Sequence, residues 1–309
     1  MSNEPNTNQG SLVKSTNQGL MIKSSSLVKR GLEQILAQKT SIVRFPTNMS
    51  LGTLWGRDVR LNLRREHGWK KVGEAMGDVI IPLFINLKLY SRITLPLKNL
   101  NPDDLYALEF SFYITNEDLI NIQGLTGLKR LRIKYESPRY MNPLNRIDER
   151  GLNFILRLTQ LESLNLLNVR CVSDKELAVL CNLPKLIELS LGGTAITDTG
   201  LAYLSKLTNL QSLSIPGLNI TDKGMDYIGT LHSLEILDIS EIKLTRLKYL
   251  QGLKNLKELW LGHTGISDDG IKYLSGLTNL EMLHLEDTGI SDDGVKKLQQ
   301  ALPNCEIDK

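Results

Sequence analysis

The sequence has few cysteines and no long apolar run. Its three cysteines are Cys171, Cys181 and Cys305, and none lies in a CxxC pair or near histidines at metal-ligand spacing. Their odd number argues against a disulfide framework, so we expect them to be small apolar side chains of a core in a reduced compartment. The longest strongly apolar stretch, residues 79–85 (VIIPLFI), is much too short to cross a bilayer.

Targeting and catalytic signals are also missing. Residues 1–10 (MSNEPNTNQG) are polar and lack the basic start and apolar run of a secretory signal, so we expect a cytoplasmic protein. The sequence shows no Ser/His/Asp, Cys/His or phosphate-loop signature, and its four histidines are scattered. We therefore expect no enzymatic activity and no cofactor.

The net charge of +3 is unevenly distributed. Residues 1–100 contain 15 Lys+Arg against 6 Asp+Glu, a net charge of +9, and residues 101–309 contain 22 against 28, a net charge of −6. A basic front end suits an acidic partner such as nucleic acid or an anionic membrane. The segment RREHGWKK (64–71), interpreted as a basic loop, is the candidate contact for such a partner, and a solvated hairpin tip is the simpler interpretation.

Internal similarity dominates the rest of the chain. The pattern Leu-x-x-Leu-x-Leu recurs at spacings of 23, 33, 25, 24, 24, 22 and 24 residues, and a last fragment follows at residues 305–307. The pattern begins at Leu105, Leu128, Leu161, Leu186, Leu210, Leu234, Leu256 and Leu280.

Each unit predicts a strand, a turn and a short helix. Residues 186–191 (LIELSL) alternate as a strand does, and residues 201–207 space leucines by three, as on one helical face. Between them, the hydroxyl of Thr197 is expected to cap the helix and Asp198 to lie against its positive end. One aspartate per coil is too few oxygens for calcium. A glycine recurs two residues after the aspartate, which predicts a place where a side chain would collide with the neighbouring coil: Gly200, Gly224, Gly270 and Gly294.

Residues 105–307 resemble a leucine-rich repeat protein. The repeat L-x-x-L-x-L-x-x-T-x-I-[ST]-D-x-G-L-x-x-L is similar to the variety found in many bacterial proteins and in eukaryotic F-box relatives. The resemblance implies an α/β solenoid, a right-handed horseshoe with a parallel inner sheet and short outer helices, and it implies no chemistry. The coil at Leu234 lacks the Asp-x-Gly turn, so we expect an irregularity near residues 242–247.

Three parts are expected in the chain: a flexible polar tail (1–24), a helix and β-rich cap (25–100), and the solenoid (101–309). Residues 26–38 (SLVKRGLEQILAQ) predict an amphipathic helix, for packing or for recruitment. Apolar alternation predicts strands that cover the open edge of the first coil. These strands are SLGTLW (50–55), DVRLNL (58–63), GDVIIP (77–82) and FINLKLY (84–90).

The variable strand positions face the concave side in this register and supply the candidate binding residues. Trp260 has no core to fill there, and with its neighbours it forms a patch rich in the residue types that interfaces favour. Burial by another part of the chain or by a second copy is the alternative. The patch comprises Ile236, Glu258, Trp260, Met282 and His284.

A second candidate lies in the coil at Leu128, which exceeds the usual length by nine residues. Three basic residues on its strand precede the loop 135–146, whose aromatic and arginine side chains are hot-spot types at a strand end. A spacer loop without a partner remains equally open. The residues are Arg130, Arg132 and Lys134, followed by Tyr135, Arg139 and Tyr140.

The sequence thus predicts a bacterial, non-enzymatic scaffold that binds a protein partner through the concave face and the 135–146 loop. Two alternatives stay open: an adaptor for nucleic acid or anionic membrane through the basic front end, and the targeting subunit of a larger enzyme complex, although residues 1–50 resemble no F-box. A metal held by His263 and His284 with nearby carboxylates is a further, weaker alternative.

Overall fold

The computed structural model describes residues 97–98, 100–103, 105–110, 114–133 and 147–309 together with the backbone of five upstream strands. The expected tail (1–24), the expected helix (26–38) and the expected strand 58–63 lie outside the described residues. The five strands are β1 (Thr40–Arg44), β2 (Gly52–Arg57), β3 (Trp69–Ala75), β4 (Asp78–Pro82) and β5 (Ile85–Leu89).

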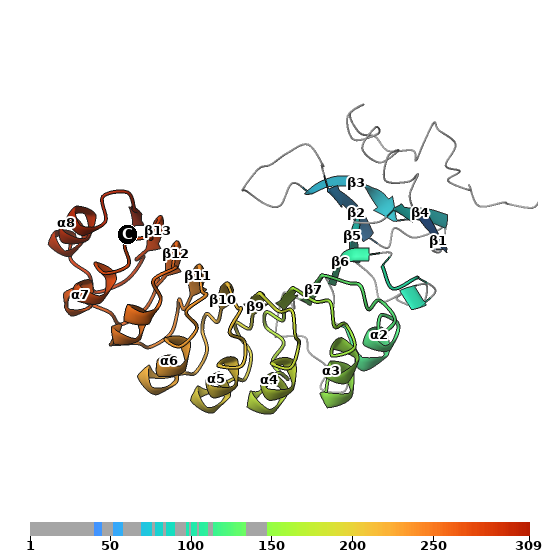
Figure 1. Cartoon of the computed structure of the whole chain (residues 1–309), viewed down its shortest axis with the longest axis horizontal. Coiled ribbons are helices and arrows are strands. Elements are labelled where there is room, and N and C mark those ends of the chain that lie inside the picture. Colours follow the sequence, from blue (N-terminus) through green and yellow to red (C-terminus); the bar gives the residue numbers. More distant parts are fainter. Residues whose placement is uncertain are drawn as a thin grey trace, which may run out of the picture.

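The repeats form a curved array with a parallel sheet on its inner side and short helices on its outer side (Figure 1). Consecutive strands pair in parallel and in register, so equivalent positions of successive coils form straight rows across the sheet. The predicted solenoid is confirmed. Its strands are β6 (Leu105–Phe110), β7 (Arg130–Ile133), β8 (Ser163–Asn165), β9 (Glu188–Ser190), β10 (Ser212–Ser214), β11 (Ile236–Asp238), β12 (Glu258–Trp260), β13 (Met282–His284) and β14 (Glu306–Asp308).

Upstream strands extend this sheet past the first coil. β5 pairs in parallel with β6, β2 pairs antiparallel with β5, and β3 pairs antiparallel with β2. The expectation that strands cover the open edge of the first coil is confirmed for the strands 84–90 and 50–55, since β5 occupies that edge and β2 pairs with β5. The expected strand 77–82 does not join them, because β4 pairs with β1 in a separate two-stranded sheet. One prediction is wrong: the basic loop does not extend to residue 71, because β3 begins at Trp69 and pairs along its length with β2.

The outer side consists of short helices, and one coil departs from the pattern. In the coil at Leu234 a 3-10 helix, η4 (Lys248–Gly252), replaces the α-helix, which confirms the expected irregularity. This coil has Arg246 at the position of the repeated aspartate. The other outer helices are α2 (Asn116–Ile120), α3 (Glu149–Ile155), α4 (Asp174–Leu180), α5 (Asp198–Leu204), α6 (Asp222–Ile228), η5 (Asp268–Gly270), α7 (Ile271–Leu274) and α8 (Asp292–Ala301).

The core lies between sheet and helices, and it confirms the predicted phase of the repeat. In β11 and β12 the central leucines, Leu237 and Leu259, are completely buried, whereas Ile236 and Trp260 on either side of them are each 37% exposed. Alternation along a strand thus sends the leucines into the core and the variable residues to the concave face. Stacking the coils lets each one bury the leucines of its neighbour, which no single coil could do.

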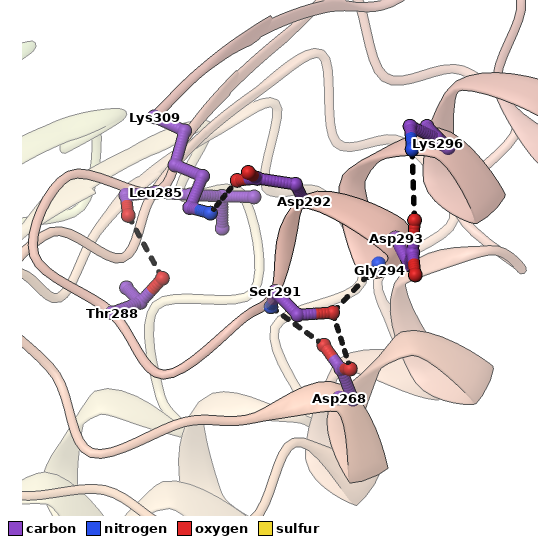
Figure 2. A network of polar contacts seen from close by, with 9 residues as sticks. All are labelled: Asp268, Leu285, Thr288, Ser291, Asp292, Asp293, Gly294, Lys296 and Lys309. Atoms are coloured by element: carbon purple, nitrogen blue, oxygen red, sulfur yellow. Dashed lines mark hydrogen bonds and ion pairs between the residues drawn. The ribbon is translucent and has the colours of Figure 1, made fainter.

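The repeated aspartate joins each coil to the next one. Asp198 accepts hydrogen bonds from the amide (2.7 Å) and the hydroxyl (2.6 Å) of Thr221, which begins the following helix. We call this arrangement the aspartate clamp. Figure 2 shows its last copy, in which the Ser291 hydroxyl donates to Asp268 and accepts from the Gly294 amide. The other copies are Asp174 with Thr197 and Asp222 with Thr245.

The clamp corrects one prediction and explains another. The aspartate does lie in the first turn of its own helix, but Thr197 makes no capping bond to its own helix and instead donates to Asp174. The capping prediction is confirmed at Thr221 and Ser291, whose hydroxyls accept from amides of their own helices. Three of the recurring glycines lie directly against the clamp carboxylate of the preceding coil. A Cβ added at Gly200, Gly224 or Gly294 would overlap the clamp carboxylate of the preceding coil, which confirms the predicted collision at these three positions. At Gly270 no carboxylate is near, and the closest atom would be Cδ1 of Leu247 at 3.0 Å.

Candidate protein-binding surface

The five residues predicted for the C-terminal end of the concave face lie on three adjacent strands. Ile236, Glu258 and Met282 form one row, and Trp260 and His284 lie together in the next. The strands β11, β12 and β13 follow one another on the inner side of the array (Figure 1). We call these five residues the C-terminal concave patch.

Trp260 is held in place on this surface by two contacts. Its ring stacks on the imidazole of His284, with ring centroids 3.5 Å apart and planes inclined by 15°. Its indole N–H donates to a carboxylate oxygen of Glu258 at 2.6 Å. The ring is therefore positioned in advance yet stays accessible, which is the state that favours an anchor residue at an interface.

His284 is mostly covered by its surroundings. Its Nδ1 lies 3.5 Å from an Asp308 carboxylate oxygen, and its side chain is only 13% exposed. The buried Nε2 has no hydrogen-bond partner among the residues that the structure describes. The imidazole thus acts as a platform for the indole ring.

The two histidines considered for a metal have separate partners. His263 lies in the turn after β12 with a positive φ of 56°, and its Nδ1 is 3.0 Å from a carboxylate oxygen of Asp287. His284 faces Asp308 instead. Within the described part of the chain, no group of three or more His, Cys, Asp or Glu side chains could hold a metal ion.

Carboxylates surround the patch, and the sequence reasoning missed their grouping. Asp238 lies beside Trp260 in the same row and accepts hydrogen bonds from the Ser214 hydroxyl (2.9 Å) and the Ser240 amide (3.1 Å). Glu306 and Asp308 extend the two rows on β14. The sequence does contain a sign of this grouping, because no inward-facing position of β11 to β14 is Lys or Arg.

At the opposite end of the concave face, basic side chains form ion pairs with carboxylates of the same chain. Arg130 passes over β8 to reach Glu188 on β9, with a guanidinium nitrogen 2.9 Å from a carboxylate oxygen. Arg132 lies 4.0 Å from Glu109 on β6. These two predicted binding residues are therefore already engaged within the chain. Lys134, Tyr135, Arg139 and Tyr140 lie outside the described residues, as does the whole 135–146 loop.

The buried cysteines fit the core role expected for them. Burial raises the pKa of the Cys181 thiol to about 12 and that of the Cys305 thiol to about 11. These thiols stay protonated at neutral pH, and only a thiolate is a good nucleophile or metal ligand. Among the described helices, none combines the length and the apolar character that a membrane span requires.

Comparison with known proteins agrees with this architecture. A family model described as "Leucine Rich repeat" matches residues 182–205, 252–275 and 276–298. The solenoid has the leucine-rich repeat fold. No curated protein sequence matches it. Leucine-rich repeat solenoids present extended concave surfaces suited to binding other proteins.

One solved structure supports the fold, and two others are similar to this chain at lower TM-scores. An internalin (inlF) from Listeria monocytogenes is 23% identical, with a TM-score of 0.53, and the match covers 71% of this leucine-rich repeat chain and 57% of the internalin. Internalin C2 (inlC2) from the same species is 25% identical over 63% of this chain and 83% of its own, with a TM-score of 0.41. A leucine-rich repeat protein from Leptospira interrogans is 20% identical over 70% and 62%, with a TM-score of 0.41.

Proposed function

We propose that this leucine-rich repeat protein is a non-enzymatic scaffold that binds a protein partner through its concave face. The C-terminal concave patch is the main contact and the 135–146 loop is a second one. The observation that carries this proposal is the exposed Trp260 ring, fixed by His284 and Glu258. Tryptophan is enriched among the residues that dominate binding at protein interfaces, and here it is flanked by a second exposed apolar residue, Ile236.

Pre-organisation strengthens the case for Trp260. A side chain that is already ordered loses less conformational entropy on binding, so more of the contact energy contributes to affinity. Ile236 adds an exposed apolar contact next to Glu258 on the neighbouring strand. The middle of the face offers fewer anchors, because one of its rows consists of the small polar residues Asn165, Ser190 and Ser214.

The test is a binding experiment with Trp260→Ala. The tagged chain is used to purify its partner from the native host, and the dissociation constant of the purified pair is then measured for each variant. We expect Trp260→Ala to weaken binding by about 2 kcal/mol, or about 30-fold, with little change in thermal stability.

Tyr227→Ala is the matched control. Tyr227 is an aromatic residue on the outer helix α6 with 42% exposure, similar to that of Trp260, and its removal should leave binding unchanged. Equal affinity of Trp260→Ala and wild type would remove the patch as the binding site.

A further inference from the structure

The inward positions of β11 to β14 have a single sign of charge. None of them is Lys or Arg, and carboxylates occur in both rows and in the turn position that follows. A surface of one sign attracts partners of the opposite sign and repels others. The carboxylates are those of Asp238, Glu258, Glu286, Glu306 and Asp308.

Among the described residues, three of these carboxylates have no lysine or arginine partner. In the described part of the chain, no lysine or arginine nitrogen lies within 4.0 Å of Asp238, Glu258 or Glu306, whereas Glu188 at the other end is paired with Arg130. The neighbouring Lys257 is already engaged at 2.5 Å by Glu235. The hydrogen-bond donors that serve Asp238 and Glu258 are neutral groups, namely a hydroxyl, an amide and an indole.

Trp260 adds a surface that suits a cation. His284 on β13 stacks against one face of its indole ring. By strand order, the opposite face points back toward β11, where Asp238 occupies the same row. A cation over an indole face is attracted by the π-electrons, and a carboxylate beside the same face reinforces that attraction.

We infer that the C-terminal concave patch binds an extended, arginine-bearing basic segment of a protein partner. The inference rests on the proposed function and names the chemistry of the partner. A planar guanidinium can stack on the free face of Trp260 while it donates to the carboxylates of Asp238 and Glu258. Ile236 and Met282 contact the apolar side chains of the same segment. An acidic segment is repelled at this site.

The test uses the intact chain and four fluorescein-labelled 12-residue peptides, with dissociation constants measured by fluorescence anisotropy. In the first peptide, arginines alternate with leucine and serine, and in the others Lys, Gln or Glu replaces every arginine. We expect the Arg peptide to bind at least about 10-fold more tightly than the Gln peptide, the Lys peptide to fall between them, and the Glu peptide not to bind.

Charge-removing variants locate the site. Glu258→Gln and Asp238→Asn should each weaken the Arg peptide by about 5-fold or more, because each removes a carboxylate beside Trp260. Asp293→Asn is the matched control, since it removes the same charge on the outer helix α8, where Asp293 pairs with Lys296, and it should change affinity less than 2-fold. Thermal melts confirm that each variant is folded.

Two results would overturn the inference: equal affinity for the Arg and Gln peptides, or equal effects of Glu258→Gln, Asp238→Asn and Asp293→Asn. If either occurs while Trp260→Ala still loses the native partner, the inference on chemistry fails and the proposed function stands. If Trp260→Ala keeps the native partner, the proposed function itself fails.

Discussion

Asp198 in one coil and Thr221 in the next are joined by two hydrogen bonds, from the Thr221 amide and from its hydroxyl. The amide at the start of a helix has no partner within that helix, so the preceding coil supplies one. The clamp therefore satisfies a backbone group and couples neighbouring coils at the same time. A repeat array folds cooperatively because of the interaction energy between neighbouring coils.

Removing the clamp should lower stability. We expect Asp198→Ala to reduce the free energy of unfolding by about 1–3 kcal/mol, because it leaves the Thr221 amide and hydroxyl without their acceptor. Asp269→Ala is the control, since Asp269 is an exposed aspartate in η5. Urea unfolding followed by circular dichroism measures both. Similar midpoints for the two variants would show that the clamp contributes nothing to stability.

Substitution by alanine should destabilise the chain far more at Gly224, which lies against the aspartate clamp, than at the equivalent Gly270, where no clamp is present. Gly224→Ala would place a methyl group on the Asp198 carboxylate, so we expect a loss of about 1–3 kcal/mol. At Gly270 the preceding coil has no aspartate, and the nearest atom is Cδ1 of Leu247 at 3.0 Å. Gly270→Ala should therefore change stability by less than about 1 kcal/mol.

A double-mutant cycle isolates the collision from other effects of alanine. In an Asp198→Ala background the carboxylate is gone, so the additional cost of Gly224→Ala should fall toward that of Gly270→Ala. Urea unfolding of the two single variants and the double variant gives the coupling energy. Strictly additive effects would mean that Leu201, whose Cδ1 lies 2.9 Å from the added Cβ, and not the Asp198 carboxylate causes the loss.

The leucines could be predicted from the sequence because their period alone determines which side of a strand is buried. Leu259 and Trp260 illustrate this, since a one-residue shift in register would exchange their environments. The role of Asp198 could not be predicted, because its partner lies 23 residues ahead in the next coil. An aspartate at a helix start also satisfies a purely local rule, so nothing in the pattern demanded a second partner.

The candidate site was predicted as a set of residues and not as an arrangement. Trp260 and His284 were both named, but their stacking depends on side-chain orientations that a pattern does not contain. Arg130 was assigned to a partner, yet Glu188, 58 residues later, already engages it. Each acidic residue near Trp260, taken singly, resembles an ordinary solvated side chain, and only the register between strands brings them together.

Acid should destabilise the chain through carboxylates that are hydrogen-bonded in the folded state. The side chain of Arg150 is the main cause that lowers the pKa of Asp148 to about 2, and bonds from Ser291 lower the pKa of Asp268. A carboxyl whose pKa is lower in the folded chain than in the unfolded chain, where it is about 3.9, stabilises the fold above that value. This contribution is lost as the pH falls from about 4 toward 2.

Asp148→Asn tests this dependence. Asn is also a good helix-capping residue, so the variant keeps the start of α3 while it removes the titrating group. We expect the difference in melting temperature between wild type and variant to be constant above about pH 5 and to shrink as the pH falls toward 2. A difference that stays constant down to pH 2 would show that Asp148 does not contribute to acid sensitivity.

The irregular coil contains a buried hydroxyl that should cost stability. Tyr249 in η4 is 6% exposed, its hydroxyl has no hydrogen-bond partner among the described residues, and burial raises its pKa. A buried polar group without a partner loses its bonds to water and gains nothing in return. We therefore expect Tyr249→Phe to raise the free energy of unfolding by about 1 kcal/mol.

Tyr227→Phe is the control for this substitution. Its side chain on α6 is 42% exposed, so its hydroxyl reaches solvent, and we expect a change below about 0.5 kcal/mol. Urea unfolding of both variants against wild type provides the comparison. A loss of stability in Tyr249→Phe would show that the hydroxyl is bonded in solution, and that the 3-10 turn depends on that bond as well as on packing.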